Sequence, residues 1–121
     1  MTGGKSKGKI IVIWVLAIIV AGLFIAAGLS KLLNPEKHLE NFAGWGYPPW
    51  FMYVTGFFEA GGGLLALVPK SRIYGVLLLS VTMAGATLTH VMAGEFAAAP
   101  VPLVFLALVS VLGLLCREKP D

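Results

Sequence analysis

Charged residues are scarce in this chain. Only 12% of its 121 residues are Asp, Glu, Lys or Arg, whereas soluble domains carry about 25%. Hydrophobic residues make up 58% of the sequence. There is too little charge to cover the surface of a soluble domain of this size, so the composition excludes a water-soluble enzyme and indicates a membrane protein.

Cysteine and histidine are also rare. Cys116 is the one cysteine of the sequence, which excludes an internal disulfide and a reactive dithiol pair. Of the two histidines, His38 lies in a polar segment and His90 in an apolar one, so haem ligation by a facing pair is only weakly indicated. Glu59 and His90 lack a third ligand at regular spacing, and we predict no metal site.

Long hydrophobic runs, in contrast, are abundant. Four of them cover residues 10–30, 49–69, 73–92 and 99–116, each close to the length that crosses a bilayer as a helix. We therefore predict an all-α integral membrane four-helix bundle as a single domain over residues 10–116. Residues 1–9 are expected to be a disordered basic tail and residues 117–121 a polar tail. The first run could also be a secretory signal, but it is longer than the usual signal core, which favours a retained helix.

A polar connection separates the first two runs. Asn34 can cap a short helix that starts at Pro35, and Leu39 and Phe42 share one face of it, so we expect an amphipathic helix at the membrane interface. Aromatic residues gather around the end of this connection, as in an interfacial belt. They are Trp45, Tyr47, Trp50 and Tyr53.

The basic residues are distributed unevenly over the connections. Seven lie in the N-terminal segment, the turn after the second run and the C-terminal segment, and two lie in the other connections, at Lys31 and Lys37. The positive-inside rule therefore predicts that both termini are cytoplasmic. The net charge of +3 follows from these clusters, and no nucleic-acid motif accompanies it.

Glu59 is the one charged residue of the second run, within Gly56-Phe-Phe-Glu-Ala-Gly-Gly-Gly63. A carboxylate inside a bilayer needs a partner and faces the protein interior. The neighbouring glycines favour close approach of another helix. We expect the partner of Glu59 to be Lys31, Thr87 or His90, in that order.

Helical spacing allows these residues to converge. Gly56, Glu59 and Gly63 share one stripe of the second helix, while Thr87 and His90 share one stripe of the third. The candidate site is therefore an outward-facing polar cavity formed by Lys31, Glu59, Thr87 and His90, with an aromatic wall of Trp45, Trp50 and Phe57. A purely structural ion pair between Lys31 and Glu59 would explain the same pattern without any chemistry, and Lys31 could equally be an interfacial anchor.

Several short motifs resemble those of DoxX-like membrane proteins, and together they extend over nearly the whole chain. They are Gly28-Leu-Ser-Lys31-Leu, Gly46-Tyr-Pro48, Gly56-Phe-Phe-Glu59-Ala-Gly-Gly, Met83-Ala-Gly-Ala86 and Thr89-His90. The resemblance implies a four-helix integral membrane protein with a loose link to quinone-linked redox chemistry. It implies no catalytic residue, because no catalytic motif of an oxidoreductase is identifiable here.

Two functions from different classes remain. In the first, the chain is an accessory subunit of a membrane redox system, with quinone in the cavity and electrons supplied by a partner, since no cofactor motif is present. In the second, it is a non-catalytic scaffold or assembly factor that binds a partner membrane protein or another copy of itself. A small-solute transporter is a third reading, although no internal inverted repeat is visible. In each case the lipid bilayer is a partner and nucleic acid is not.

Overall fold

The computed structural model describes residues 6–116, which form five α-helices and no strand. The helices are α1 (Lys7–Leu33), α2 (Pro35–Gly44), α3 (Pro49–Leu67), α4 (Arg72–Met92) and α5 (Pro100–Cys116). The predicted all-α class is confirmed for this part of the chain, including a short helix between the first two long ones. The tail predicted at 117–121 lies outside the described residues.

The first helix starts earlier than expected. Ser6 is its N-cap, and the Ser6 side chain accepts a hydrogen bond from the backbone N–H of Lys9 at 3.2 Å. This bond satisfies one of the N–H groups that a helix start leaves open, so residues 7–9 are helical and not part of a disordered tail. Residues 1–5 of the predicted tail lie outside the described part of the chain.

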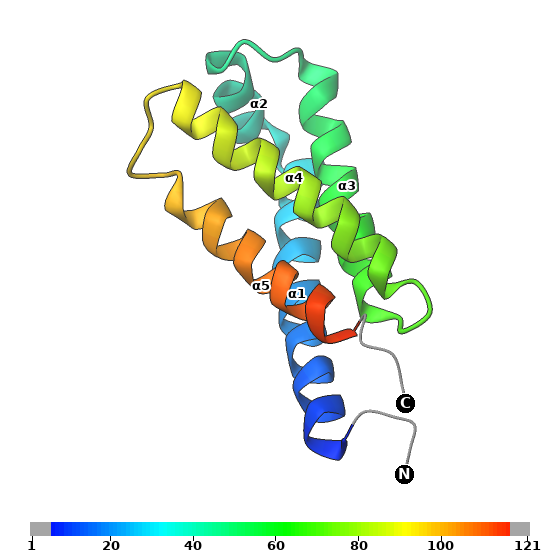
Figure 1. Ribbon diagram of the computed structural model, residues 1–121. Coiled ribbons are helices and arrows are strands. Elements are labelled where there is room, and N and C mark those ends of the chain that lie inside the picture. The colour runs from blue at the N-terminus through cyan, green and yellow to red at the C-terminus, as the bar shows by residue number, and fades with distance from the viewer. Residues whose placement is uncertain (1–5, 117–121) are drawn as a thin grey trace.

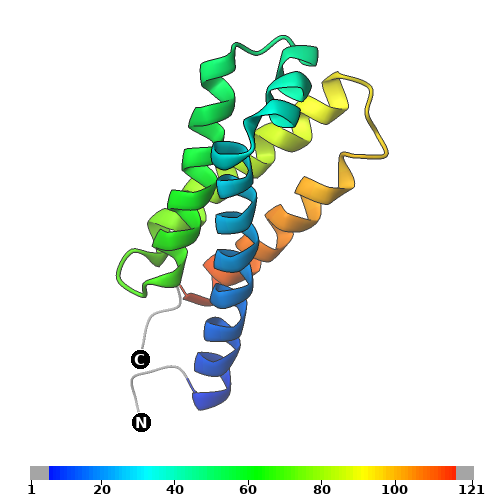
Figure 2. The ribbon, with the colours of Figure 1, turned by 180° about the vertical axis from the view of Figure 1, so that it is seen from behind.

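The connections alternate between two ends of the bundle (Figure 1). The beginning of α1, the end of α5 and the turn between α3 and α4 lie at one end, and α2 and the loop between α4 and α5 lie at the other. The view from behind shows the same arrangement, with α1 and α3 side by side (Figure 2). Helix α3 packs between α1 and α4, and α5 covers α4 and part of α1.

Glycine and alanine backbones form the contact between α1 and α3. A Cβ atom on Gly28 would collide with the backbone of Gly56 and Ala60 of α3, and one on Gly63 would lie 2.9 Å from Ile25 Cγ1 of α1. On the other side of α3, a Cβ on Gly75 would meet the backbone of Gly62 and Ala66. Small residues at these positions let the three helices approach at backbone distance, which is how helices associate where lipid removes the hydrophobic driving force.

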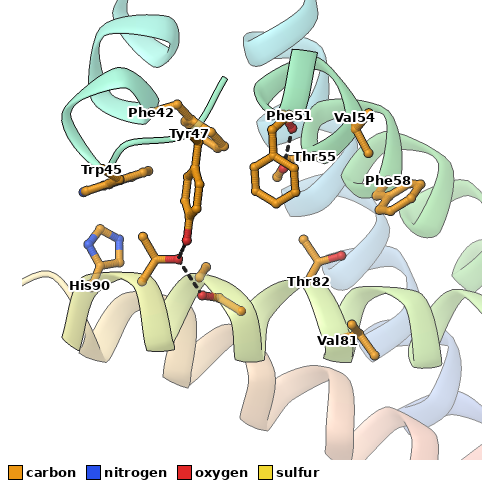
Figure 3. Close-up of a pocket in the computed structure, with 13 residues that line it drawn as sticks. Phe42, Trp45, Tyr47, Phe51, Val54, Thr55, Phe58, Val81, Thr82 and His90 are labelled. Atoms are coloured by element: carbon orange, nitrogen blue, oxygen red, sulfur yellow. Dashed lines mark hydrogen bonds between the residues drawn. The ribbon is translucent and has the colours of Figure 1, made fainter. Parts of the chain in front are cut away.

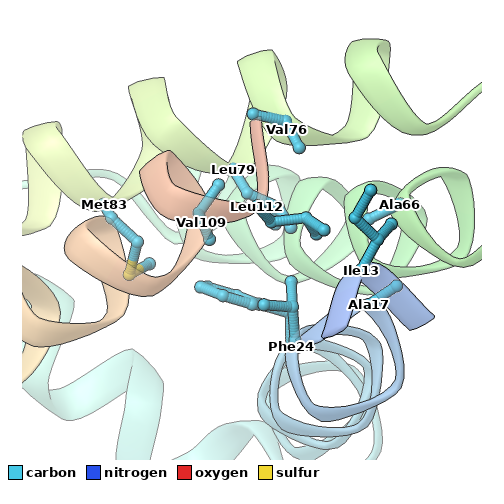
Figure 4. Close-up of a cluster of buried hydrophobic side chains, with 10 residues drawn as sticks. Ile13, Ala17, Phe24, Ala66, Val76, Leu79, Met83, Val109 and Leu112 are labelled. Carbon is cyan, nitrogen blue, oxygen red and sulfur yellow. The ribbon is translucent and has the colours of Figure 1, made fainter. Parts of the chain in front are cut away.

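The apolar core is formed by side chains of α1, α4 and α5 together with Ala66 of α3 (Figure 4). Phe24 of α1 is 1% exposed and packs edge-on against Phe105 of α5, with ring centroids 5.6 Å apart. Leu79 of α4 and Leu112 of α5 are fully buried beside it. The core therefore joins α5 to the layer of α1, α3 and α4, which pack against one another through their glycines.

Arg72 fixes the turn between α3 and α4. It is 5% exposed, and its Nε and Nη2 donate to the carbonyl oxygens of Ala66 and Leu67 at 2.8 and 3.1 Å. Its guanidinium also lies 4.9 Å from the centroid of the Trp14 ring. A cation at the last carbonyls of α3 favours the negative end of that helix, and the stacking on Trp14 joins α1 to the same point.

Within residues 6–116, the helices α1 and α4 are long and apolar enough to cross a membrane. Only 28% of the residues in the apolar stretch of α1, and 22% of those in the apolar stretch of α4, are buried. A core helix of a soluble protein would bury most of such a stretch. Most of this apolar surface faces outward, as in a bundle surrounded by lipid.

Candidate functional site

Glu59 and Lys31 form an ion pair inside the contact between α1 and α3. Lys31 Nζ donates to Glu59 Oε1 at 2.7 Å, with the two side chains 14% and 5% exposed. Lys31 is the first of the three predicted partners, and this expectation is confirmed. Because removal of either charge would leave the other buried, the pair ties the last turn of α1 to the middle of α3.

The local sequence makes room for this pair. Gly56 lies one turn before Glu59, and a Cβ there would be 2.9 Å from Lys31 Cβ. Its missing side chain lets the stem of Lys31 lie flat against α3. The predicted buried stripe of Gly56, Glu59 and Gly63 is confirmed, because all three residues are buried.

A separate pocket of about 330 Å³ lies between α2, α3 and α4 (Figure 3). Aromatic and aliphatic side chains form most of its wall. Its lining comprises Phe42, Trp45, Tyr47, Phe51, Val54, Thr55, Phe58, Val81, Thr82, Gly85, Ala86, Thr89 and His90. An apolar cavity of this size with a few polar groups is typical of a site for a small molecule.

Polar groups gather at one end of the pocket. His90 Nδ1 and Glu95 Oε1 lie 2.7 Å apart, and Trp45 Nε1 donates to the same oxygen at 3.0 Å. The Trp45 and His90 rings meet edge to face, 5.2 Å between centroids. These contacts hold the residues that follow α2 against the end of α4.

Tyr47 and Thr89 form a second contact at this end of the pocket. The hydroxyl oxygens of Tyr47 and Thr89 lie 2.7 Å apart, and the Tyr47 ring reaches from the segment before α3 down to α4 (Figure 3). Thr89 in turn donates to the carbonyl oxygen of Gly85 at 2.9 Å. This contact joins the connection after α2 to the end of α4, 42 residues further along the chain.

Two groups near the loops have shifted pKa values. The pKa of Glu95 is lowered, first by its hydrogen bond with His90 and then by that with Trp45. The pKa of His38 in α2 is lowered by burial and then by the charges of Lys31 and Lys37. His38 Nε2 lies 3.0 Å from the hydroxyl oxygen of Ser30, which joins α2 to α1.

The residues predicted to share one polar cavity lie in two places. Lys31 and Glu59 belong to the contact between α1 and α3, and His90 lines the pocket between α2, α3 and α4. Thr87 Oγ1 donates to the carbonyl oxygen of Met83 in its own helix at 2.9 Å. Neither Lys31, Glu59 nor Thr87 is part of the pocket lining.

The predicted aromatic wall is divided in the same way. Trp45 lines the pocket, whereas Trp50 and Phe57 are 64% and 67% exposed and lie outside its lining. Sequence reasoning missed Glu95 and Tyr47 as members of this site. For Glu95 a signal was available, because a glycine at the end of a helix commonly turns the chain back onto the last helical turn.

These features define a small bundle of apolar helices with outward apolar faces, a buried ion pair and an apolar pocket near the interhelical loops. The chain belongs to the DoxX-like family, whose model matches residues 15–112. Family membership and the two long apolar helices together indicate a membrane protein. Neither a curated protein nor a solved structure matches the chain.

Proposed function

We propose that this DoxX-like protein is a four-helix integral membrane protein that holds a quinone-class ligand in the pocket between α2, α3 and α4. In this role it serves as an accessory subunit of a membrane redox system, with electrons supplied by a partner. The pocket is the observation that carries the proposal.

Four membrane spans are supported by the pattern of the helices. Helices α1 and α4 are long and apolar enough to cross, and α3 and α5 have 19 and 17 residues, close to the length required. The helices α3 and α5 lie alongside the other two in the same bundle. With both termini cytoplasmic, α2 and the pocket lie toward the outer face.

A flat ring with oxygen substituents suits the pocket. Its walls carry Phe42, Phe51 and Phe58, on which a ring can stack. His90, Thr55 and Thr82 are among the lining residues and are the kind of polar residue that orients a ligand in an apolar site. The volume of about 330 Å³ fits a quinone head group.

Gly85 allows a direct test. It lines the pocket, and a Cβ added there meets no atom within 4 Å. Gly85→Leu therefore fills the pocket without displacing the backbone. Gly61→Leu is the matched control, since Gly61 in α3 is also open on its Cβ side and does not line the pocket.

The readout is quenching of Trp45 fluorescence by trimethylbenzoquinone in detergent, with Trp14 and Trp50 replaced by Phe. We expect saturable quenching in this background and with Gly61→Leu, and only linear, non-saturable quenching with Gly85→Leu. Equal quenching curves for the two glycine variants would refute quinone binding in this pocket.

The position of Glu59, between α1 and α3, favours a second function, that of a scaffold or assembly factor. Its partner Lys31 lies within the contact between two helices of the chain itself, so the buried carboxylate is accounted for by packing. This supports a scaffold or assembly factor that binds a partner membrane protein through outward faces such as the one carrying Trp50 and Phe57. Stoichiometric recovery of one membrane protein in detergent pull-down, lost with Phe57→Ala and retained with Gly85→Leu, would favour this function over the first.

A further inference from the structure

We infer that Glu95 is a positioning residue that fixes the tautomer of His90, so that His90 Nε2 accepts a hydrogen bond from a hydroxyl group of the pocket ligand. The inference rests on the proposed function and narrows it to the reduced, dihydroxy form of the ring. It adds a residue outside the pocket lining, in the loop between α4 and α5.

The backbone alone places Glu95 beside His90. Gly94 has a positive φ of 76°, which turns the chain back at the end of α4. The backbone N–H of Glu95 then donates to the carbonyl oxygen of His90 at 2.8 Å. This hydrogen bond fixes the backbone of Glu95, and with it the base of its side chain, next to the last turn of α4.

The carboxylate uses its position to hold one ring nitrogen. Glu95 Oε1 lies 2.7 Å from His90 Nδ1, and an ionised carboxylate at this distance accepts a hydrogen bond from a nitrogen that carries a proton. Trp45 Nε1 donates to the same oxygen at 3.0 Å, which restricts the carboxylate further. The neutral imidazole then carries its proton on Nδ1, and its other nitrogen is an acceptor.

That second nitrogen is available to a ligand. His90 lines the pocket, and among residues 6–116 the hydrogen bonds of its ring involve Nδ1 alone. An acceptor at the end of an apolar, aromatic pocket selects a ring that carries a hydroxyl group. A ring whose oxygens are methylated fits the same walls but leaves Nε2 unpaired, and an unpaired group in an apolar site weakens binding.

The test compares two ligands of the same ring, trimethylhydroquinone and its dimethyl ether. Binding is measured through Trp45 fluorescence in detergent, in the background with Trp14 and Trp50 replaced by Phe. We expect the hydroquinone to bind about tenfold more tightly than the ether. His90→Phe should abolish this preference while the affinity for the ether stays the same, and His38→Gln should change neither value.

The role of Glu95 has its own signature. On a His38→Gln background, the ring ¹⁵N shifts of the remaining histidine, recorded at a pH where that ring is neutral, should report a proton on Nδ1 and none on Nε2. Glu95→Ala should release the ring to the other tautomer and reduce the preference for the hydroquinone, while Glu95→Asp should restore part of both. A structural role alone would change stability without moving the tautomer.

The outcomes separate the two proposals. If neither trimethylbenzoquinone nor trimethylhydroquinone binds, the proposed function fails and this inference fails with it. If the quinone binds but the hydroquinone and its ether bind equally, the pocket stands and the inference is wrong. A ring protonated on Nε2 in the presence of Glu95 would also overturn it.

Discussion

Lys31 Nζ and Glu59 Oε1 meet at 2.7 Å across the contact between α1 and α3, although they lie 28 positions apart in the chain. The glycines at 28 and 56 lie at the same crossing, where a Cβ on either would overlap the opposite helix. The ion pair and the glycine contact therefore depend on each other. A substitution that weakens the ion pair should therefore also weaken the glycine contact, and the reverse.

Replacing Glu59 by Leu should lower stability strongly, because it leaves Lys31 partly buried without its carboxylate. Loss of one partner of a buried pair costs about 3–5 kcal/mol, and Gln should cost less because it keeps an acceptor. Thermal unfolding in detergent measures both variants. The double variant with Lys31→Met should recover much of the loss, and equal midpoints for Leu and Gln would contradict the assignment of the pair.

Gly28→Ala should also destabilise the bundle, by about 1–3 kcal/mol, because its Cβ collides with the backbone of Gly56 and Ala60. Gly22→Ala is the control in the same helix, where a Cβ meets no atom within 4 Å. That change should be neutral or stabilising by up to about 1 kcal/mol, since alanine is the better helix former. Similar unfolding midpoints for the two variants would argue against a close contact at Gly28.

The stability that Glu95 contributes should depend on pH. Its pKa is lowered from 4.5 in the folded protein by His90 and Trp45, so the unfolded chain binds a proton at higher pH than the folded one. The contribution is therefore complete above the ordinary value and is lost as the pH falls through the lowered one. The difference in unfolding midpoint between the native chain and Glu95→Gln should shrink from pH 7 to pH 3, whereas a difference that grows would reverse the sign. Glu40→Gln controls for the change of net charge.

The orientation can be tested with single cysteines on a Cys116→Ala background. Phe96 is a suitable outer position because it is 68% exposed, whereas Gly94 has a positive φ that a cysteine would strain. With both termini cytoplasmic, an impermeant thiol reagent should label Phe96→Cys in intact cells and spare Ser6→Cys. The reverse pattern would mean the opposite orientation.

Much of the fold follows from local patterns in the sequence. Uncharged runs and prolines at helix starts predicted the helices within a few residues, and the spacing of Gly56, Glu59 and Gly63 predicted the buried face of α3. Lys31 could be named as the partner of Glu59 because a buried carboxylate requires one and few cations are within reach.

The pocket could not be predicted in the same way. Its shape depends on where the α2–α3 connection brings Trp45 and Tyr47 relative to α4, and helical periodicity says nothing about a connection that is not helical. Helical spacing predicts that His90 lies in the same cavity as Glu59. In the structure, the turn at Gly94 brings Glu95 to His90 instead. Competition between nearby partners is decided by distances that a sequence pattern does not contain.

The long separation between Lys31 and Glu59 has a consequence for biosynthesis. At about 5–20 residues per second, a ribosome completes Lys31 roughly 1 to 6 seconds before Glu59 exists. During that interval the end of α1 has no carboxylate to bind, and a lysine stem of this length can place its charge among the lipid head groups. The ion pair can therefore form only after α3 has been synthesised, and until then the charge of Lys31 depends on head groups and water.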